Sequence, residues 1–231
     1  MINDVKQLLV AIVVAICLLP GCSGLLPKQT LQMTYYSLDA AESQAFKDES
    51  ARDENARDEL ASTSNALPTL TINTPKAAAG FDTRRMMYTR APHKLEYFAQ
   101  NEWIDTPARM LQALLVAAIA QTKNFKAVLA KQDKVKSELR LDCEIVKLIQ
   151  SFNVKPSQVQ FLLRATIIDN MTNKVVAYRE FDERVNAISD SPNGGAIAAN
   201  QAVNGALEKL ALFSTQTAIN WKKANSSIQH P

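Results

Sequence analysis

Glycine and histidine are both scarce in this chain of 231 residues, which contains six glycines and two histidines. With so few glycines, neither a phosphate-cradling glycine-rich loop nor a nucleophile elbow is present. His93 lies in a predicted turn and His230 lies next to the C-terminus, and neither has partners at metal-ligand spacing. We therefore predict no metal, no cofactor and no catalytic residue, and hence a protein that is not an enzyme.

Two acidic residues are the main candidates for catalytic chemistry. Asp142 and Glu144 share one face of a predicted strand and could act as paired carboxylates. The opposite face carries Leu141, Cys143 and Ile145, which favours the interpretation that the two acids form the solvated side of that strand. Cys143 points with the apolar residues and is predicted to be a small core residue.

The chain also lacks an apolar run long enough to cross a bilayer, which takes about 20 residues. Residues 8–19 form an apolar run of 12 residues, a length typical of a signal-peptide core. The next apolar stretch, residues 110–120, is also too short and is amphipathic. Leu19-Pro20-Gly21-Cys22 looks like a lipobox, the motif cut just before a cysteine that becomes lipidated. An ordinary membrane anchor, or a secretory signal that happens to contain a cysteine, is the alternative.

These features predict that residues 1–21 are a lipoprotein signal peptide and that Cys22 is the lipidation site, carrying palmitate or related acyl chains. Ser23 is not the aspartate that resembles an inner-membrane retention signal, so we predict anchoring on the periplasmic face of the outer membrane. Cys17 leaves with the signal peptide, so Cys143 is the only remaining thiol and no internal disulfide can form. The mixed formal charge of +3 gives no argument for nucleic-acid binding.

The mature chain is predicted to begin with a lipidated tether, residues 22–33, followed by one domain over residues 34–222. Within that domain, residues 40–65 are rich in Ala, Ser, Asp, Glu and Arg and hold almost nothing to bury. We predict a solvated insertion there, either a surface helix or disordered, with a binding role as the alternative. Residues 223–231 are predicted to be a C-terminal tail.

Hydrophobic periodicity predicts a series of strands and two main helices. The first helix is expected to start at Asp105 or Thr106, with Pro107 in its first turn, and to end near residues 123–124. The last helix is expected over residues 196–221. This order predicts an α+β fold in which an antiparallel sheet carries both helices on one face. The predicted strands cover residues 34–38, 67–72, 86–90, 95–99, 139–148, 159–167 and 175–185, with a bulge near 145–147.

One block of sequence is distinctive. A tyrosine-bearing strand with Tyr97 is followed by Asn101-Glu102-Trp103, a polar step, Pro107 and a Met-Leu pair at the start of the helix. An early Tyr-Tyr-x-Leu strand and a late helix ending in Ala-x-x-Trp, residues 218–221, accompany it. The pattern resembles the ABC-type transport auxiliary lipoprotein family, which includes the paraquat-inducible protein C type. The likeness spans most of residues 31–222, and the long insertion is a departure from it.

The resemblance implies a non-enzymatic accessory component of an envelope transport system. Its partners would be an ABC permease and ATPase and a mammalian-cell-entry type substrate-binding protein that carries lipids between the two membranes. The alternative function is a structural assembly lipoprotein for an outer-membrane barrel or secretin, since such a protein could share the fold class. Whether the protein forms a homo-oligomer stays open.

Trp103 and Tyr97 are the candidate partner-binding residues. Trp103 precedes the first helix, and it either plugs the start of that helix by packing on Tyr97 and Leu111, or contacts a partner directly.

Overall fold

The computed structural model describes residues 32–39, 66–131 and 135–226. The predicted signal peptide, Cys22, most of the tether, the insertion at 40–65 and the end of the tail lie outside the described residues. Among the helices that are described, none is both long enough and apolar enough to span a membrane.

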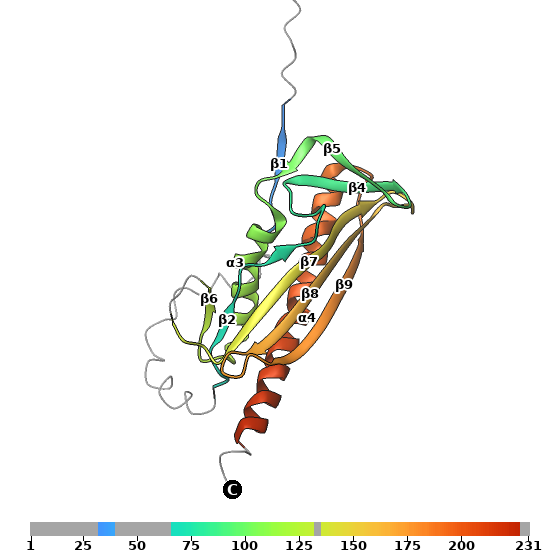
Figure 1. Ribbon diagram of the computed structural model, residues 1–231. Helices are drawn as coiled ribbons and strands as arrows, with labels where there is room; N and C mark the ends of the chain where they lie inside the picture. The colour runs from blue at the N-terminus through green and yellow to red at the C-terminus, as the bar shows by residue number, and fades with distance from the viewer. Residues whose placement is uncertain (1–31, 40–65, 132–134, 227–231) are drawn as a thin grey trace, which may run out of the picture. The chain divides into compact units, whose positions relative to one another are not determined.

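Three long antiparallel strands form one side of the sheet, with the last of them at its edge (Figure 1). They are β7 (Leu139–Ser151), β8 (Gln158–Asp169) and β9 (Val175–Asn186). Their apolar residues alternate with polar ones, so that one face is buried and the other is solvated. The register of β7 on β8 shifts between Ile145 and Lys147, which confirms the predicted bulge.

The other edge of β7 pairs in succession with three shorter strands. β2 (Leu70–Ile72) lies beside its start, β3 (Lys76–Ala77) beside its middle and β4 (Arg85–Ala91) beside its end. All three run parallel to β7. The sheet continues outward from these strands with β6 (Val128–Ala130) beside β2, β5 (Lys94–Trp103) beside β4, and β1 (Thr34–Tyr36) beside β5.

The sheet is therefore mixed, whereas an antiparallel sheet was expected from the sequence. The antiparallel description holds for the β7–β9 meander and for the β4–β5 hairpin. For β2, β3 and β4, which pair in parallel with β7, the difference arises between β5 and β7, where the chain passes through a helix and β6 before it returns. A connection of that length permits parallel pairing, and alternation along single strands does not distinguish the two directions.

Both main helices lie on one face of the sheet, as Figure 1 shows, and the predicted α+β architecture is confirmed. They are α3 (Pro107–Ala120) and α4 (Pro192–Ser226). Thr106 is the N-cap of α3, but its side chain makes no capping hydrogen bond. Asp105 instead forms an ion pair of 3.2 Å with Arg109 in the first turn. The expected side-chain cap is therefore absent, and the Asp105–Arg109 ion pair stabilises the first turn instead.

Helix α4 begins four residues earlier than expected. Pro192 is its first residue, and Ser191 Oγ accepts a hydrogen bond of 3.1 Å from the Gly194 amide. A Cβ on Gly194 would lie 2.3 Å from the Ser189 carbonyl oxygen, and one on Gly195 would lie 2.1 Å from Gln150 Oε1. The helix was expected to begin only at residue 196, after both glycines, but they lie in its first turn, where Gly195 allows a close approach to Gln150 of β7.

The hydrophobic core lies between the sheet and the two helices. Helix α3 contributes a stripe at helical spacing, and helix α4 contributes small residues near its start and larger ones farther along. Phe181 of β9 meets Phe213 of α4 edge-on, with ring centroids 5.9 Å apart. The largest fully buried side chains are Phe161, Leu70, Ile72, Leu111, Leu115, Ile119, Leu139, Leu141, Ile145, Leu163, Ile167 and Leu210.

Candidate interaction surface

Strands β1, β5 and β4 present one face away from the core. Tyr35 of β1 pairs with Glu102 of β5, and Glu102 pairs with Arg85 of β4. Residues directly opposite on neighbouring strands share a face of the sheet. These three side chains therefore form one row across three strands that come from distant parts of the sequence.

Two tyrosine rings on this face are each covered by a guanidinium group. Arg84 lies over the Tyr35 ring at 5.5 Å from its centroid, and Arg85 lies over the Tyr97 ring at 4.1 Å. Tyr35 is 49% exposed, Tyr97 is 48% exposed, and Leu95, two residues before Tyr97 along β5, is 51% exposed. We call Tyr35, Arg84, Arg85, Leu95 and Tyr97 the arginine–tyrosine face.

Neither α3 nor α4, the two helices among the described residues, packs extensively on β1, β4 or β5. Helices α3 and α4 pack mainly on β2, β3, β6, β7, β8 and β9. The Nε of Arg84 donates a hydrogen bond of 3.2 Å to the Trp103 carbonyl oxygen, which holds the guanidinium beside Tyr35. Among the described residues, neither Arg84 nor Arg85 forms an ion pair. The face thus combines ordered aromatic rings with two guanidinium groups that form no ion pair with a described carboxylate, although Glu102 lies opposite Arg85 in the same row.

The short strand β1 is held in place from the helix side. The side-chain amide of Asn200 on α4 accepts a hydrogen bond from the Asp39 amide at 2.7 Å and donates one to the Ser37 carbonyl oxygen at 3.0 Å. Leu38, between them, is buried, and the Ile104 amide bonds to the Tyr36 carbonyl oxygen at 2.7 Å. These contacts fix the position of Tyr35 although β1 has only three residues.

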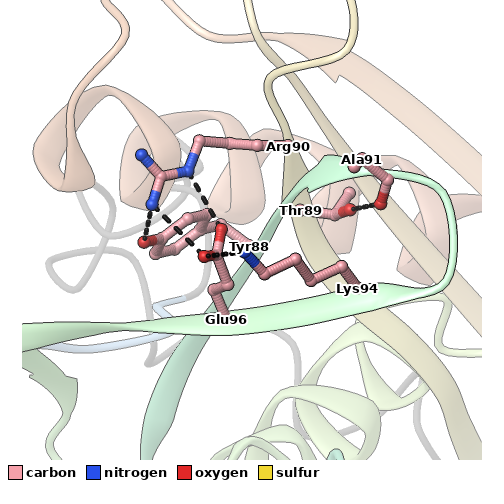
Figure 2. A network of polar contacts seen from close by, with 6 residues as sticks. All are labelled: Tyr88, Thr89, Arg90, Ala91, Lys94 and Glu96. Carbon is pink, nitrogen blue, oxygen red and sulfur yellow. Dashed lines mark hydrogen bonds and ion pairs between the residues drawn. The ribbon is translucent and has the colours of Figure 1, made fainter.

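On the other face of the β4–β5 hairpin, the charged side chains form ion pairs and hydrogen bonds with one another (Figure 2). Arg90 Nε and Lys94 Nζ lie 2.9 Å and 3.1 Å from the two carboxylate oxygens of Glu96, and Arg90 also bonds to the Tyr88 hydroxyl at 3.0 Å. Hydrogen bonds from Arg90 and Lys94 lower the pKa of Glu96. The carboxylate on this face is paired with two cationic side chains, whereas the arginines of the arginine–tyrosine face on the opposite side form no described ion pair.

The two aromatic candidates from the sequence lie on opposite faces of β5. Tyr97 is at the surface, whereas Trp103 is only 3% exposed and lies in the core. An irregularity in the β4–β5 register between them changes the alternation of β5, which explains why residues six apart do not share a face. Tyr97 is thus available to a partner, and Trp103 takes the position expected of a plug at the start of α3 without packing on Tyr97.

The residues considered for catalysis are engaged in structural contacts. Asn73 Nδ2 donates a hydrogen bond to Asp142, and Glu144 forms an ion pair of 2.7 Å with Arg164 on the solvated face of the sheet. Cys143 is buried, and desolvation raises the pKa of its thiol. His93 occupies the hairpin turn with φ of 64°. In the part of the chain that the structure describes, no three potential metal ligands gather.

Comparison with known proteins decides the family. Residues 53–211 match the family described as the ABC-type transport auxiliary lipoprotein component. The chain belongs to this family. The match contains the Tyr97 to Leu111 block on which the resemblance was recognised, and it confirms that resemblance. No curated protein matches the sequence.

Solved structures support the fold of this auxiliary lipoprotein. A crystal structure from Xanthomonas campestris, assigned to family DUF330, has a TM-score of 0.64 at 19% identity and covers 69% of this chain and 90% of that one. A second crystal structure, described as an uncharacterized protein, has a TM-score of 0.57 at 11% identity and covers 78% and 97%. At such identities the likeness shows the fold alone.

Sequence reasoning found Tyr97 but missed the other members of the arginine–tyrosine face. The adjacent pair Arg84-Arg85 directly before a predicted strand was a local signal for a charged surface. Tyr35 gave no such signal, because its neighbour Tyr36 faces the core side and the two look alike in the sequence. Only the pairing of β1 with β5 brings Tyr35 next to Arg84.

Proposed function

We propose that this auxiliary lipoprotein of an ABC-type transport system binds its transport partner through the arginine–tyrosine face. The observation that carries the proposal is the pair of half-exposed tyrosines, Tyr35 and Tyr97, each stacked under an arginine on an uncovered face of the sheet. Tyrosine and arginine are enriched in protein interfaces and dominate their binding energy.

The stacking prepares these side chains for binding. A guanidinium held over a ring loses less conformational freedom on association than a free one, so less of the interaction energy is lost to ordering. Arg84 and Arg85, which form no ion pair with a described carboxylate, add selectivity for a partner surface that carries carboxylates. The sheet beneath provides a rigid support for the whole group.

The partner in this proposal is the mammalian-cell-entry type substrate-binding protein, which works with the ABC permease and ATPase to carry lipids between the membranes. Cys22 anchors the chain to the periplasmic face of the outer membrane through its acyl chains. Eleven residues lie between Cys22 and Thr34, so the tether spans at most about 40 Å. Docking therefore takes place near the membrane. The lipobox, the missing aspartate after Cys22 and the family membership support this arrangement.

The test uses the full lipidated chain carrying Tyr97→Ala. Because Tyr97 is half-exposed, the melting temperature should stay nearly unchanged. Co-purification of the permease, the ATPase or the mammalian-cell-entry protein from envelopes should fall, since truncating an aromatic hot spot costs about 2 kcal/mol or more of binding. Tyr178→Ala is the matched control, because Tyr178 is 54% exposed on a strand of the same sheet but lies on β9, away from this face.

Two results would count against the proposal. Equal partner recovery with Tyr97→Ala and with the native chain would remove the arginine–tyrosine face as the docking surface. Recovery of an outer-membrane barrel or secretin with the native chain, in place of any transport component, would support the assembly alternative.

A further inference from the structure

Strand β5 has an open edge beside the arginine–tyrosine face. One edge of β5 pairs with β4 along the hairpin, and the other pairs with β1 only at residues 101–103. Among the described residues, no strand lies along that second edge at residues 94–100. In Figure 1, β5 lies at the margin of the sheet, and the short β1 lies beside one end of it. The backbone donors and acceptors of this stretch that point away from β4 have no strand partner in the described part of the chain, so an added strand could pair with them.

The composition of this edge differs from that of the other long free edge in the sheet. β9 pairs with β8 alone, and five of its twelve residues, from Arg179 to Arg184, are charged. Charged side chains on an edge strand discourage pairing with other chains. Residues 94–100 of β5 include two charged residues, Lys94 and Glu96, which form an ion pair with each other, and Glu96 also pairs with Arg90. The β9 edge is thus protected against strand addition, and the β5 edge is not.

The side chains beside the open edge indicate what kind of segment fits there. Neighbouring strands lie about 4.8 Å apart, so an added strand would place alternate side chains beside Leu95 and Tyr97. On that face Arg84 and Arg85 have no described ion-pair partner. A segment that matches it therefore presents apolar side chains to Leu95 and Tyr97 and a carboxylate to the guanidinium groups.

We propose that residues 94–100 of β5 receive an extended, acidic segment of the transport partner as an additional strand of the sheet. The identity of the partner rests on the function proposed above, whereas the strand addition rests on the open edge itself. Backbone hydrogen bonds hold the segment, and the arginine–tyrosine face selects its side chains. A segment of this same chain, from its own tether or a second copy, is the competing occupant.

The register of an added strand can be measured directly. The photoreactive residue p-benzoylphenylalanine is placed at position 95, 97 or 99 of the full lipidated chain in envelopes, since all three positions are exposed. Val175, 61% exposed on β9, is the control position. Mass spectrometry then maps each adduct. The expected result is one partner segment that contains Asp or Glu and in which the adduct moves by about two residues for each step along β5.

A backbone measurement separates strand addition from side-chain docking. In the complex, amide hydrogen exchange over residues 94–100 should slow by roughly 10-fold or more, while exchange in β9 stays unchanged. The double substitution Arg84→Glu and Arg85→Glu should abolish most of the adduct. Arg184→Glu is the matched control, because Arg184 lies on the β9 strand and pairs with Asp182.

Several results would overturn the inference. These are adducts scattered over unrelated segments, adducts to this chain itself, absent adducts, or partner binding with unchanged exchange at residues 94–100. If transport components still co-purify in any of these cases, the proposed function stands and only the strand addition fails. An ordered adduct series on an acidic segment of a protein outside the transport system would support the strand addition and contradict the proposed function.

Discussion

The indole Nε1 of Trp221 donates a hydrogen bond of 3.0 Å to Oδ2 of Asp169. Asp169 ends β8, and its other carboxylate oxygen accepts the amides of Met171 and Thr172 in the turn to β9. The last turns of α4 are thereby tied to the end of the sheet. Burial by itself would raise the pKa of Asp169, but hydrogen bonds from Thr172, Trp221 and Met171 outweigh burial and lower the pKa.

Replacing Trp221 with Phe should remove this hydrogen bond while keeping an aromatic ring. A hydrogen bond to a charged group contributes about 1.5–3 kcal/mol, so the free energy of unfolding at pH 7 should fall by that amount. The pKa of folded Asp169 is below its ordinary value of 3.8, so the ionised group stabilises the fold above that value. The contribution is lost as the pH falls through the lowered pKa. In urea denaturation, the native and Trp221→Phe proteins should therefore differ in free energy of unfolding by a constant amount above about pH 5, and by less below about pH 4. A difference at pH 3 as large as that at pH 7 would contradict the role assigned to Asp169.

Gly195→Ala should destabilise the protein because the new methyl group would overlap Gln150 Oε1. Overpacking of this kind costs about 1–3 kcal/mol. Gly205 lies in the same helix, but a Cβ there would lie 3.5 Å from its nearest neighbour, Glu183 Oε2. Gly205→Ala should therefore stabilise the helix by about 0.5–1 kcal/mol. In a Gln150→Ala background the cost of Gly195→Ala should shrink, and an unchanged cost in thermal unfolding would show that another contact is responsible.

Core truncations at the start of α3 should be costly. Leu111 is fully buried and Leu114 is 9% exposed, so Leu→Ala at either should cost about 2–5 kcal/mol, with the larger loss at Leu111. Trp103→Ala should cost about 3–5 kcal/mol, with loss of function following loss of folded protein. Leu212→Ala is the control, because Leu212 is 71% exposed and should change stability by less than about 0.5 kcal/mol. A Trp103→Ala protein with native stability and reduced partner recovery would instead make Trp103 a partner contact.

Cys22→Ala should prevent both lipidation and signal cleavage. The precursor would then keep residues 1–21 and incorporate no labelled palmitate, because the lipobox no longer contains its acceptor thiol. Metabolic labelling followed by separation of inner and outer membranes measures both the anchor and its location. Label on the Cys22→Ala chain would show that the attachment site lies elsewhere, and label of the native chain confined to the inner membrane would contradict the predicted outer-membrane location.

Deletion of residues 41–64 should leave the domain folded. The segment offers almost no apolar area to a core, and the free energy of closing a loop changes slowly with its length. The melting temperature of the shortened chain should therefore stay close to that of the native one. A cooperative loss of stability on calorimetry would show that the segment packs against the domain.

Local features of this protein could be predicted from the sequence because their causes are local. The bulge in β7 was visible as a change of apolar phase between Ile145 and Val146, and the buried stripe of α3 was visible as helical spacing. Pro107 at the start of α3 was predicted from its missing amide donor. The solvated role of Glu144 followed from alternation with Cys143 and Ile145. The family resemblance also rested on a continuous block of sequence.

Long-range pairing decided the remainder, because it joins residues whose sequence separation carries no periodic signal. Parallel pairing of β4 with β7 and of β1 with β5 depends on how the chain returns after α3 and after residue 39. The same pairing places Tyr35 beneath Arg84, and it leaves the edge of residues 94–100 that faces away from β4 without a described strand neighbour. The helix start was placed after Gly195 because the close approach of Gln150, which requires a glycine there, cannot be seen along the chain. By itself, the sequence determined which residues face the core in α3, β7 and β8, where the apolar spacing is regular. The tertiary structure alone decided which exposed residues meet, since that depends on the three-dimensional path of the backbone between elements.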